Sequence, residues 1–334
     1  MISWDLLRAI LPVYGFTEEI IDTSILQESS EINGILYLYK ICLKNGTRLV
    51  CRISDDRKTT VSRTEAQCRF SELMRRNGIC TPRIYEISDH FTMHLTIDGI
   101  DCIILLEDYA GEDIDDTSFA LYGYLGELLG KMHAVSEANP MKIPNTKLYE
   151  AILNGNASFE RILEKADPVF RQLPATAEIT KLHDGLVYEV QGLLEKLPLG
   201  TVHGDLSVFN NLVKLEGNIS VIDYALAGRE PFLSDLLSAF YASIYRYRWK
   251  DPFDSIQLTD ARLQYMRSYY TQRKLHGIEI SSYPLIAALF DGLFYCKSII
   301  YNYQLIHDDA LLDDFIFATQ HFNPSKHHVD FIGG

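Results

Sequence analysis

Three residues with hard oxygen donors, Asp205, Asn210 and Asp223, stand in one short stretch of the sequence. Carboxylate and amide oxygens are ligands that Mg²⁺ accepts in proteins, and Mg²⁺ leaves much of its coordination shell to phosphate and water. The carboxylate of Asp205, five residues before Asn210, could reach the same spot without being a ligand. The stretch therefore predicts a place that holds a metal ion and a phosphate. The alternative is structural, because an Asp before a strand is often a turn former or a cap.

A β-hairpin is predicted to position these residues. The runs 211–215 and 219–222 are rich in β-forming residues, and Glu216-Gly217-Asn218 between them is a turn signal. With Gly217 at the centre of an antiparallel pair, Asn210 would face residue 224 and lie beside Asp223. Facing Cβ atoms are roughly 5 Å apart, so the two predicted ligands would meet at one end of the hairpin.

The segment His203-Gly204-Asp205, followed by Asn210 and then by Ile222-Asp223, resembles the phosphate-transfer core of the aminoglycoside phosphotransferase and choline kinase superfamily. Proteins of that superfamily have a fold similar to that of protein kinases. By this resemblance Asp205 is the catalytic base, and Asn210 and Asp223 hold Mg²⁺. His203 is expected to brace the loop rather than to transfer a proton. The resemblance further implies that Asp235 braces the catalytic loop by accepting hydrogen bonds.

The fold implied by the resemblance is α+β, a protein-kinase-like two-lobed fold with a small antiparallel-sheet N-lobe and a larger, mainly helical C-lobe. We assign residues 1–108 to the N-lobe, with the nucleotide-binding sheet and helix. Residues 109–334 are assigned to the helical C-lobe, with the catalytic hairpin and the acceptor pocket. A chain of 334 residues can bury the large core that such a fold needs.

The N-lobe carries a second set of predicted site residues. Strands are predicted at 35–43 and 48–53, around the hairpin signal Asn45-Gly46. A helix is predicted over 60–77. In the resembled family a cation on the third strand contacts the nucleotide phosphates and pairs with a Glu on the next helix, which implies these roles for Arg52 and Glu65. A guanidinium can clamp phosphate oxygens with two donors; the alternative is that both are unrelated surface charges.

The run 103–111 reads as a buried strand that breaks into a loop, and it is similar to the hinge that joins the two lobes in the family. The resemblance implies that the carbonyl of Glu107 and the N–H of Tyr109 face the adenine edge of the nucleotide. Leu106 would then close the pocket behind the base.

Bulk properties exclude several classes of protein. The formal net charge of −14 argues against general affinity for nucleic acid or for an anionic membrane. The six cysteines stand singly, without the spacing of a zinc site or a disulfide framework. The N-terminus lacks the features of a signal peptide, and no apolar run has the length of a membrane span. We expect a cytoplasmic protein with reduced thiols.

Two acidic clusters bear on the acceptor. One is the segment 107–116, and the other contains Asp308, Asp309, Asp313 and Asp314. They could attract a cationic acceptor, or they could cap a helix and form a solvated face. The C-lobe helices do not reveal which side chains bind the acceptor.

The leading hypothesis is a phosphotransferase that moves the γ-phosphate of ATP or GTP, with Mg²⁺, to a hydroxyl group of a small molecule such as an aminoglycoside. A metabolic kinase of the choline, homoserine or sugar type is the first alternative. A protein substrate is disfavoured because Gly204 stands where regulated protein kinases have an Arg, and because few residues separate Asp223 from Pro231. A nucleotide-binding pseudokinase is the second alternative, motivated by Arg52 in a position that is often Lys.

Overall fold

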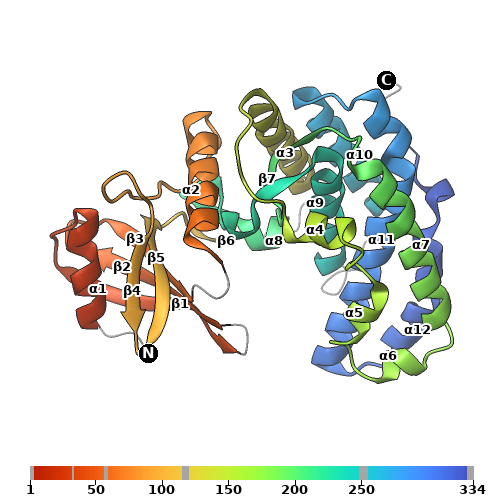
Figure 1. Ribbon diagram of the computed structural model, residues 1–334, viewed down its shortest axis with the longest axis horizontal. Helices are drawn as coiled ribbons and strands as arrows, with labels where there is room; N and C mark the ends of the chain where they lie inside the picture. Colours follow the sequence, from red (N-terminus) through yellow and green to blue (C-terminus); the bar gives the residue numbers. More distant parts are fainter. Residues whose placement is uncertain (1–3, 32–33, 56–58, 115–119, 248–254, 329–334) are drawn as a thin grey trace. The chain divides into compact units, whose positions relative to one another are not determined.

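The computed structural model describes residues 4–31, 34–55, 59–114, 120–247 and 255–328. The chain divides into two compact units, shown in the colours of the sequence in Figure 1. Unit 1 contains Met1–Asp113 and Leu212–Ala225, and unit 2 contains Ile114–Asn211 and Leu226–Gly334. The division thus falls after Asp113 rather than after residue 108. The predicted hairpin belongs to the first unit and not to the helical part of the chain.

Unit 1 is built on a five-stranded antiparallel sheet in the order β1-β2-β3-β5-β4. Its strands are β1 (Ile20–Glu31), β2 (Gly34–Leu43), β3 (Arg48–Asp55), β4 (Met93–Ile97) and β5 (Ile100–Asp108). The turn between β2 and β3 contains Gly46 with φ of 87°, a value that glycine adopts at little cost. The strand pair predicted around Asn45-Gly46 is confirmed.

A helix covers each face of this sheet (Figure 1). On one face, α1 (Trp4–Ile10) and the 3₁₀ turn η1 (Leu11–Tyr14) bury Leu7 and Ile10 against Ile53 and Ile104. On the other face, Cys68 of α2 (Val61–Arg76) lies in a small cluster packed against Leu105. The predicted helix over 60–77 is confirmed.

Local signals account for the bounds of α2. Its N-cap is Thr60, whose side chain accepts a hydrogen bond from the N–H of Arg63. At the other end Gly78 has φ of 80°, the left-handed conformation that stops a helix. The side chain of Gln67 donates to the carbonyl of Ala225 at 2.7 Å, which ties the helix to the end of the hairpin segment in the same unit.

The hairpin forms a small second sheet in unit 1, of order β6-β8-β9. Its strands are β6 (Glu112–Asp113), β8 (Leu212–Leu215) and β9 (Asn218–Val221). Leu215 pairs with Asn218, and the two loop residues Glu216 and Gly217 both have positive φ, 51° and 89°. The turn therefore centres between residues 216 and 217, and the predicted register is wrong by one residue.

Unit 2 is mainly helical. Its longer helices are α3 (Ala120–Ala138), α7 (Thr176–Leu194), α9 (Phe232–Tyr247), α10 (Ser255–Gln272) and α11 (Gly277–Ile306). Shorter ones are α4 (Lys147–Leu153), α5 (Phe159–Leu163), α6 (Val169–Gln172), α8 (Val208–Asn211) and α12 (Ala310–Ile316), with 3₁₀ turns at Phe317–Phe322 and Pro324–Lys326. A two-stranded ribbon pairs β7 (Leu199–Val202) with β10 (Gly228–Pro231). Figure 1 shows α3 and α10 side by side.

Glycines allow α3 and α10 to pack closely. A Cβ atom on Gly126 would lie 2.1 Å from the carbonyl oxygen of Tyr265, and one on Gly130 would lie 2.7 Å from that of Tyr269. Both distances are shorter than any that real Cβ atoms keep. The close approach brings the polar groups of Tyr269 and of the residues after it near the interior of the unit.

The long helix α11 is apolar as well as long. Its mean hydropathy over an 18-residue window is 1.3, enough by length and composition to cross a membrane. However, 67% of that window is buried inside the protein, as expected for the central helix of a helical core.

Candidate active site

Asp205 lies on the loop between β7 and α8. It is exposed, whereas His203 and Leu206 on either side of it are buried, with exposed fractions of 0% and 1%. Beyond them the N–H of Ser207 donates to the side chain of Asn211 at 2.8 Å, and the N–H of Val208 donates to Ser243 of α9 at 3.1 Å. The loop is thus anchored on both sides of one solvent-facing carboxylate.

Gly204 makes this loop conformation possible. Its φ is 80°, and a Cβ atom in its place would lie 2.5 Å from the carbonyl oxygen of Leu226. Any other residue would carry the cost of the left-handed conformation and would also push the loop away from Leu226. The Gly before Asp205 is therefore required by the backbone.

Asp235, in the first turn of α9, anchors the loop from the helical core. Its Oδ1 accepts a hydrogen bond from the N–H of Gly204 at 3.0 Å. Its Oδ2 lies 2.9 Å from Nε2 of His133, and both side chains are almost fully buried. The predicted bracing role of Asp235 is confirmed.

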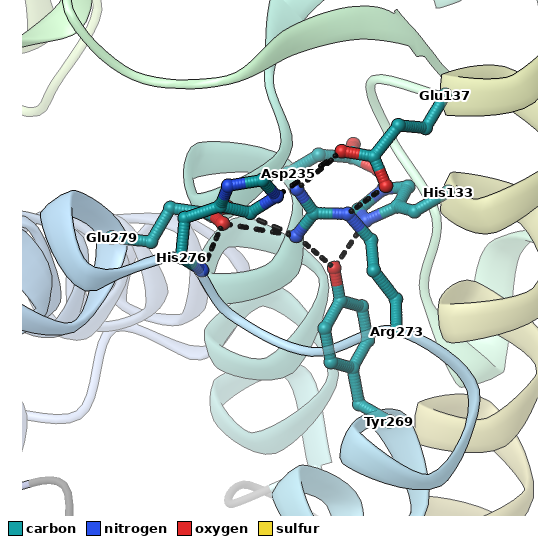
Figure 2. A network of polar contacts seen from close by, with 7 residues as sticks. All are labelled: His133, Glu137, Asp235, Tyr269, Arg273, His276 and Glu279. Carbon is teal, nitrogen blue, oxygen red and sulfur yellow. Dashed lines mark hydrogen bonds and ion pairs between the residues drawn. The ribbon is translucent and has the colours of Figure 1, made fainter.

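Figure 2 shows how the support continues behind Asp235. Nδ1 of His133 lies 2.9 Å from the hydroxyl of Tyr269, and Arg273 donates to the same hydroxyl at 3.2 Å. Burial, partly offset by the charge of Asp235, lowers the pKa of His133, which favours the neutral ring. The contacts then assign the proton to Nε2, so that His133 donates to Asp235 and accepts from Tyr269.

Arg273 is the central cation of this network. Its guanidinium donates to Glu279 of α11 at 3.0 Å and to Glu137 of α3 at 3.2 Å. His276, which precedes α11, also contacts Glu137, at 3.4 Å (Figure 2). A continuous set of polar contacts therefore joins the loop that carries Asp205 to α3, α10 and α11.

Asn210 was predicted to face residue 224 across the hairpin, but it lies before β8, in the single helical turn α8. Asn211 explains the helical turn. Its side-chain oxygen accepts a hydrogen bond from the backbone N–H of Ser207, a donor at the start of the turn. The metal-binding role of Asn210 stays a prediction.

The second group of site residues lies in unit 1 and centres on Asp223. This residue follows β9 and has φ of 60°, an uncommon conformation for a residue other than glycine and one that is found at functional sites. Its carboxylate is half exposed and accepts a hydrogen bond from Arg52 of β3 at 2.9 Å. A partly exposed carboxylate oxygen fits the donor set of a Mg²⁺ ion that takes its other ligands from phosphate and water.

Glu107 adds negative charge to this group. Burial raises its pKa to about 7; the charge of Arg52 lowers it, and that of Asp223 raises it. The predicted role of Glu107 rested on its backbone alone, yet its side chain shares the electrostatic environment of Arg52 and Asp223. Such an excess of carboxylates around one guanidinium is the setting that a divalent cation would neutralise.

The predicted pairing of Arg52 with Glu65 is wrong. Oε1 of Glu65 accepts hydrogen bonds from the backbone N–H groups of Phe91 and Thr92 and from the Thr92 hydroxyl, at 2.8 to 2.9 Å. These donors come from the loop before β4 and need a buried acceptor, whereas Arg52 has Asp223 within reach. Glu65 therefore ties α2 to the sheet edge.

One predicted contact of the hinge, that of the Tyr109 N–H with the nucleotide, is not seen in the structure. The N–H of Tyr109 donates to the carbonyl of Arg48 at 3.0 Å, which extends the pairing of β3 and β5 by one residue, so this N–H does not face a nucleotide here. Leu106 is fully buried in the core of the sheet. The ring of Tyr109 lies 3.9 Å from the ammonium group of Lys40, and its hydroxyl donates to Glu112.

The sequence did not single out Lys297 of α11, whose ammonium group is influenced by the charge of Asp205 in the same unit. Packing around its ammonium group lowers the pKa of Lys297, and the charge of Asp205 acts in the opposite direction. No local spacing could have found it, because the two residues are brought together only by the fold. Among the described residues, no group of three or more His, Cys, Asp or Glu is placed to hold a metal ion.

Comparisons with known proteins identify the family and the fold. A profile of the phosphotransferase enzyme family matches residues 39–276. In structure, the chain is similar to an amicoumacin kinase in complex with AMP-PNP, Ca²⁺ and amicoumacin, with a TM-score of 0.69 and 14% identity over 97% of this chain and 94% of that one. A microcompartment-associated aminopropanol kinase gives a TM-score of 0.63 and 15% identity over 96% and 95% of the two chains.

A spectinomycin phosphotransferase in complex with ADP and spectinomycin gives a TM-score of 0.54 and 15% identity over 96% and 98%. No curated protein matches the chain in sequence. The fold is that of the protein-kinase-like phosphotransferases, and the class of the protein is a small-molecule phosphotransferase that acts on hydroxyl groups. The chain belongs to the phosphotransferase enzyme family.

Proposed function

We propose that this enzyme transfers the γ-phosphate of ATP or GTP to a hydroxyl group of a small acceptor. The observation that carries the proposal is the catalytic loop, where the exposed Asp205 stands between buried anchors and the backbone of Gly204 is held by Asp235. In this role the Asp205 carboxylate orients the acceptor hydroxyl and accepts its proton as the oxygen bonds to phosphorus. The nucleoside diphosphate is the leaving group.

The residues of unit 1 would bind the donor. Asp223, together with Asn210 of α8, would hold Mg²⁺, which neutralises charge on the phosphates when bound. The guanidinium of Arg52, beside Asp223, is suited to contact phosphate oxygens with two donors. The carbonyl of Glu107 would lie at the purine, and Glu65 would act indirectly by fixing α2. Leu106 is fully buried in the core cluster that contains Leu7 and Ile10, so it would support the strand from behind rather than contact the base.

The acceptor is proposed to be small and hydroxylated. The relatives of known structure support this, since their complexes hold amicoumacin and spectinomycin. A cationic acceptor such as an aminoglycoside was predicted from the acidic clusters, and a choline, homoserine or sugar type of acceptor is the alternative. Asp115 and Asp116 of the first cluster lie outside the described residues.

The test is the substitution Asp205→Asn, which keeps the shape of the side chain and removes its ability to take a proton. We expect the Mg²⁺-dependent release of ADP from ATP to fall by about 10²- to 10⁴-fold, with the dissociation constant for ATP changed by less than about twofold. Asp260→Asn, on the exposed face of α10, is the matched control and should retain full activity. Near-normal turnover in Asp205→Asn would overturn the proposed role.

A further inference from the structure

Unit 2 contains a cavity of about 380 Å³ walled by α4, α5, α7 and α11. This volume is near the lower end of the range for small-molecule sites, roughly 300–1,000 Å³. Leu148, Leu293 and Ile300 provide apolar surface, and Tyr301 and Gln304 provide polar groups at its wall. The cavity therefore has the size and the mixed lining of a site for a small polar molecule.

The charged groups of the cavity are all of one sign. Arg161, Lys165 and Lys297 line it, and no Asp or Glu is among the lining residues that the structure describes. The chain as a whole has 45 acidic and 31 basic residues, so an average sample of its surface would be acidic. The basic lining is a local feature of this cavity.

In the part of the chain that the structure describes, none of these three cations forms an ion pair, although the charge of Asp205 acts on Lys297. No carboxylate there lies within 4.0 Å of the side-chain nitrogens of Arg161, Lys165 or Lys297. Arg161 donates to the side-chain oxygen of Asn156 at 3.0 Å, which fixes the direction of its guanidinium. His183, at the wall, has a lowered pKa because of burial, so it adds no fixed charge. The cavity thus presents cationic donors that an anionic ligand can use.

Lys297 connects the cavity with the reaction. It lines the cavity, and it lies within the electrostatic reach of Asp205, whose charge acts on its ammonium group. Arg161 lines the same cavity from α5. Asp205 is not itself a lining residue, so an acceptor held at Lys297 would have to extend out of the cavity to bring a hydroxyl group to Asp205.

The acidic clusters offer weaker support for a cationic acceptor than the sequence indicated. Glu112 pairs with Lys40 at 3.2 Å, and Asp108 accepts from the hydroxyl of Tyr85 at 2.7 Å. Burial raises the pKa of Glu107 to about 7, so this side chain is not a full surface charge. None of Asp308, Asp309, Asp313 and Asp314 lines the cavity.

We infer that the acceptor carries an anionic group, a carboxylate or a phosphate, which Lys297 and Arg161 bind while a hydroxyl of the same molecule is phosphorylated. The inference rests on the proposed function and names the class of its substrate. In the reaction the acceptor O–H bond breaks, its oxygen bonds to the γ-phosphorus, and the bond from that phosphorus to the β-phosphate oxygen breaks. The proton passes to Asp205, and the products are a phosphate ester and a nucleoside diphosphate.

The experiment compares acceptors that share a skeleton and differ in charge. The three-carbon set is glycerate, glycerol 3-phosphate, glyceramide and 3-aminopropane-1,2-diol; the open-chain six-carbon set is gluconate, glucitol 6-phosphate, gluconamide and glucamine. The full-length enzyme is assayed for acceptor-dependent ADP release with Mg²⁺ and ATP. We expect the anionic members to have kcat/KM values about tenfold or more above those of the neutral and cationic members. The carboxylate and phosphate members of each set separate the two sources of negative charge.

Two variants test the assigned residues. Lys297→Met and Arg161→Gln should each reduce the ratio of kcat/KM for the anionic over the neutral member by about tenfold, through KM for the acceptor and not through KM for ATP. Lys181→Met, on an exposed position of α7, should leave the ratio unchanged. A preserved ratio in both cavity variants, or a rise in KM for ATP alone, would refute the assignment.

The same assay separates failure of the inference from failure of the proposed function. If ADP release without acceptor depends on Asp205 but no anionic member of either set is used, the inference is overturned and the phosphotransferase activity stands. Preference for the amine members would overturn the inference in the same way. If ADP release does not depend on Asp205 under any condition, the proposed function itself fails.

Discussion

Replacing Gly204 by Ala should damage catalysis far more than it damages stability. A Cβ atom at this position would lie 2.5 Å from the carbonyl oxygen of Leu226, whereas real Cβ contacts are not shorter than 3.0 Å. The loop must therefore move by at least about half an ångström, and Asp205 is the next residue. A misplacement on the order of 1 Å can cost about 10²-fold in rate, so we expect kcat/KM to fall by about 10- to 100-fold.

The matched control is Gly217→Ala in the β8–β9 turn. Gly217 has φ of 89°, close to the 80° of Gly204, but a Cβ atom there would have no neighbour within 4 Å. Both variants carry the cost of a left-handed Ala, about 1–2 kcal/mol. Only Gly204→Ala adds the contact with Leu226, so the difference between the two isolates the effect of loop displacement.

The assay is the acceptor-dependent release of ADP, measured beside the midpoint of thermal unfolding. Each kcal/mol of destabilisation lowers this midpoint by about 2–4 °C in a domain of 150–250 residues, so the two midpoints should fall by similar small amounts. Activity of Gly204→Ala within about twofold of Gly217→Ala would refute the reasoning, because it would mean that the loop absorbs the contact without moving Asp205.

Two further predictions concern buried charges in unit 2. Arg273→Met should lower the free energy of unfolding by about 3–5 kcal/mol, because Glu279 is left buried without its cationic partner. Unfolding in denaturant measures this free energy. A loss below about 1 kcal/mol would contradict the prediction. Glu230, buried at 1% exposure, has its pKa raised from 4.5 to about 8 by burial. Its contribution to stability is therefore fully present below pH 4.5 and is lost as the pH rises towards 8. Glu230→Gln should therefore make the free energy of unfolding fall less steeply between these pH values. Equal slopes of this free energy against pH in the two proteins would contradict the prediction.

The strands and helices that carry strong local signals could be predicted from the sequence. The β2–β3 turn at Asn45-Gly46 and the α2 helix between Thr60 and Gly78 depend on contacts within a few residues. The β8–β9 hairpin was found, but its register was not, because Glu216 occupies a left-handed turn position that usually holds Asn, Asp or Gly. A residue that breaks the usual turn preference shifts the predicted centre.

Prediction of the site was also limited to what local sequence signals can show. The motif with Asp205 and Asp223 predicted a phosphate-transfer site through its resemblance to a family, and the roles of these residues stay predictions. The predicted partner of Arg52 was wrong, because the Glu65 carboxylate instead accepts hydrogen bonds from the backbone amides of Phe91 and Thr92. These amides lie far from Glu65 in sequence. The basic lining had no signal in the sequence, because Arg161 and Lys165 lie far from Lys297 in the chain and meet it only in the fold.

The division of the chain into two units determines which fragments and chimeras of this enzyme can fold. Unit 1 is made of two segments, and the second is Leu212–Ala225. In this segment the backbone N–H of Val221 donates to the carbonyl of Cys80 at 2.8 Å. The carbonyl of Ala225 accepts a hydrogen bond from the side chain of Gln67. A fragment that ends at Asp113 would lack these partners together with Asp223. A functional chimera between relatives must therefore exchange the first 113 residues and this hairpin together, at three junctions rather than one.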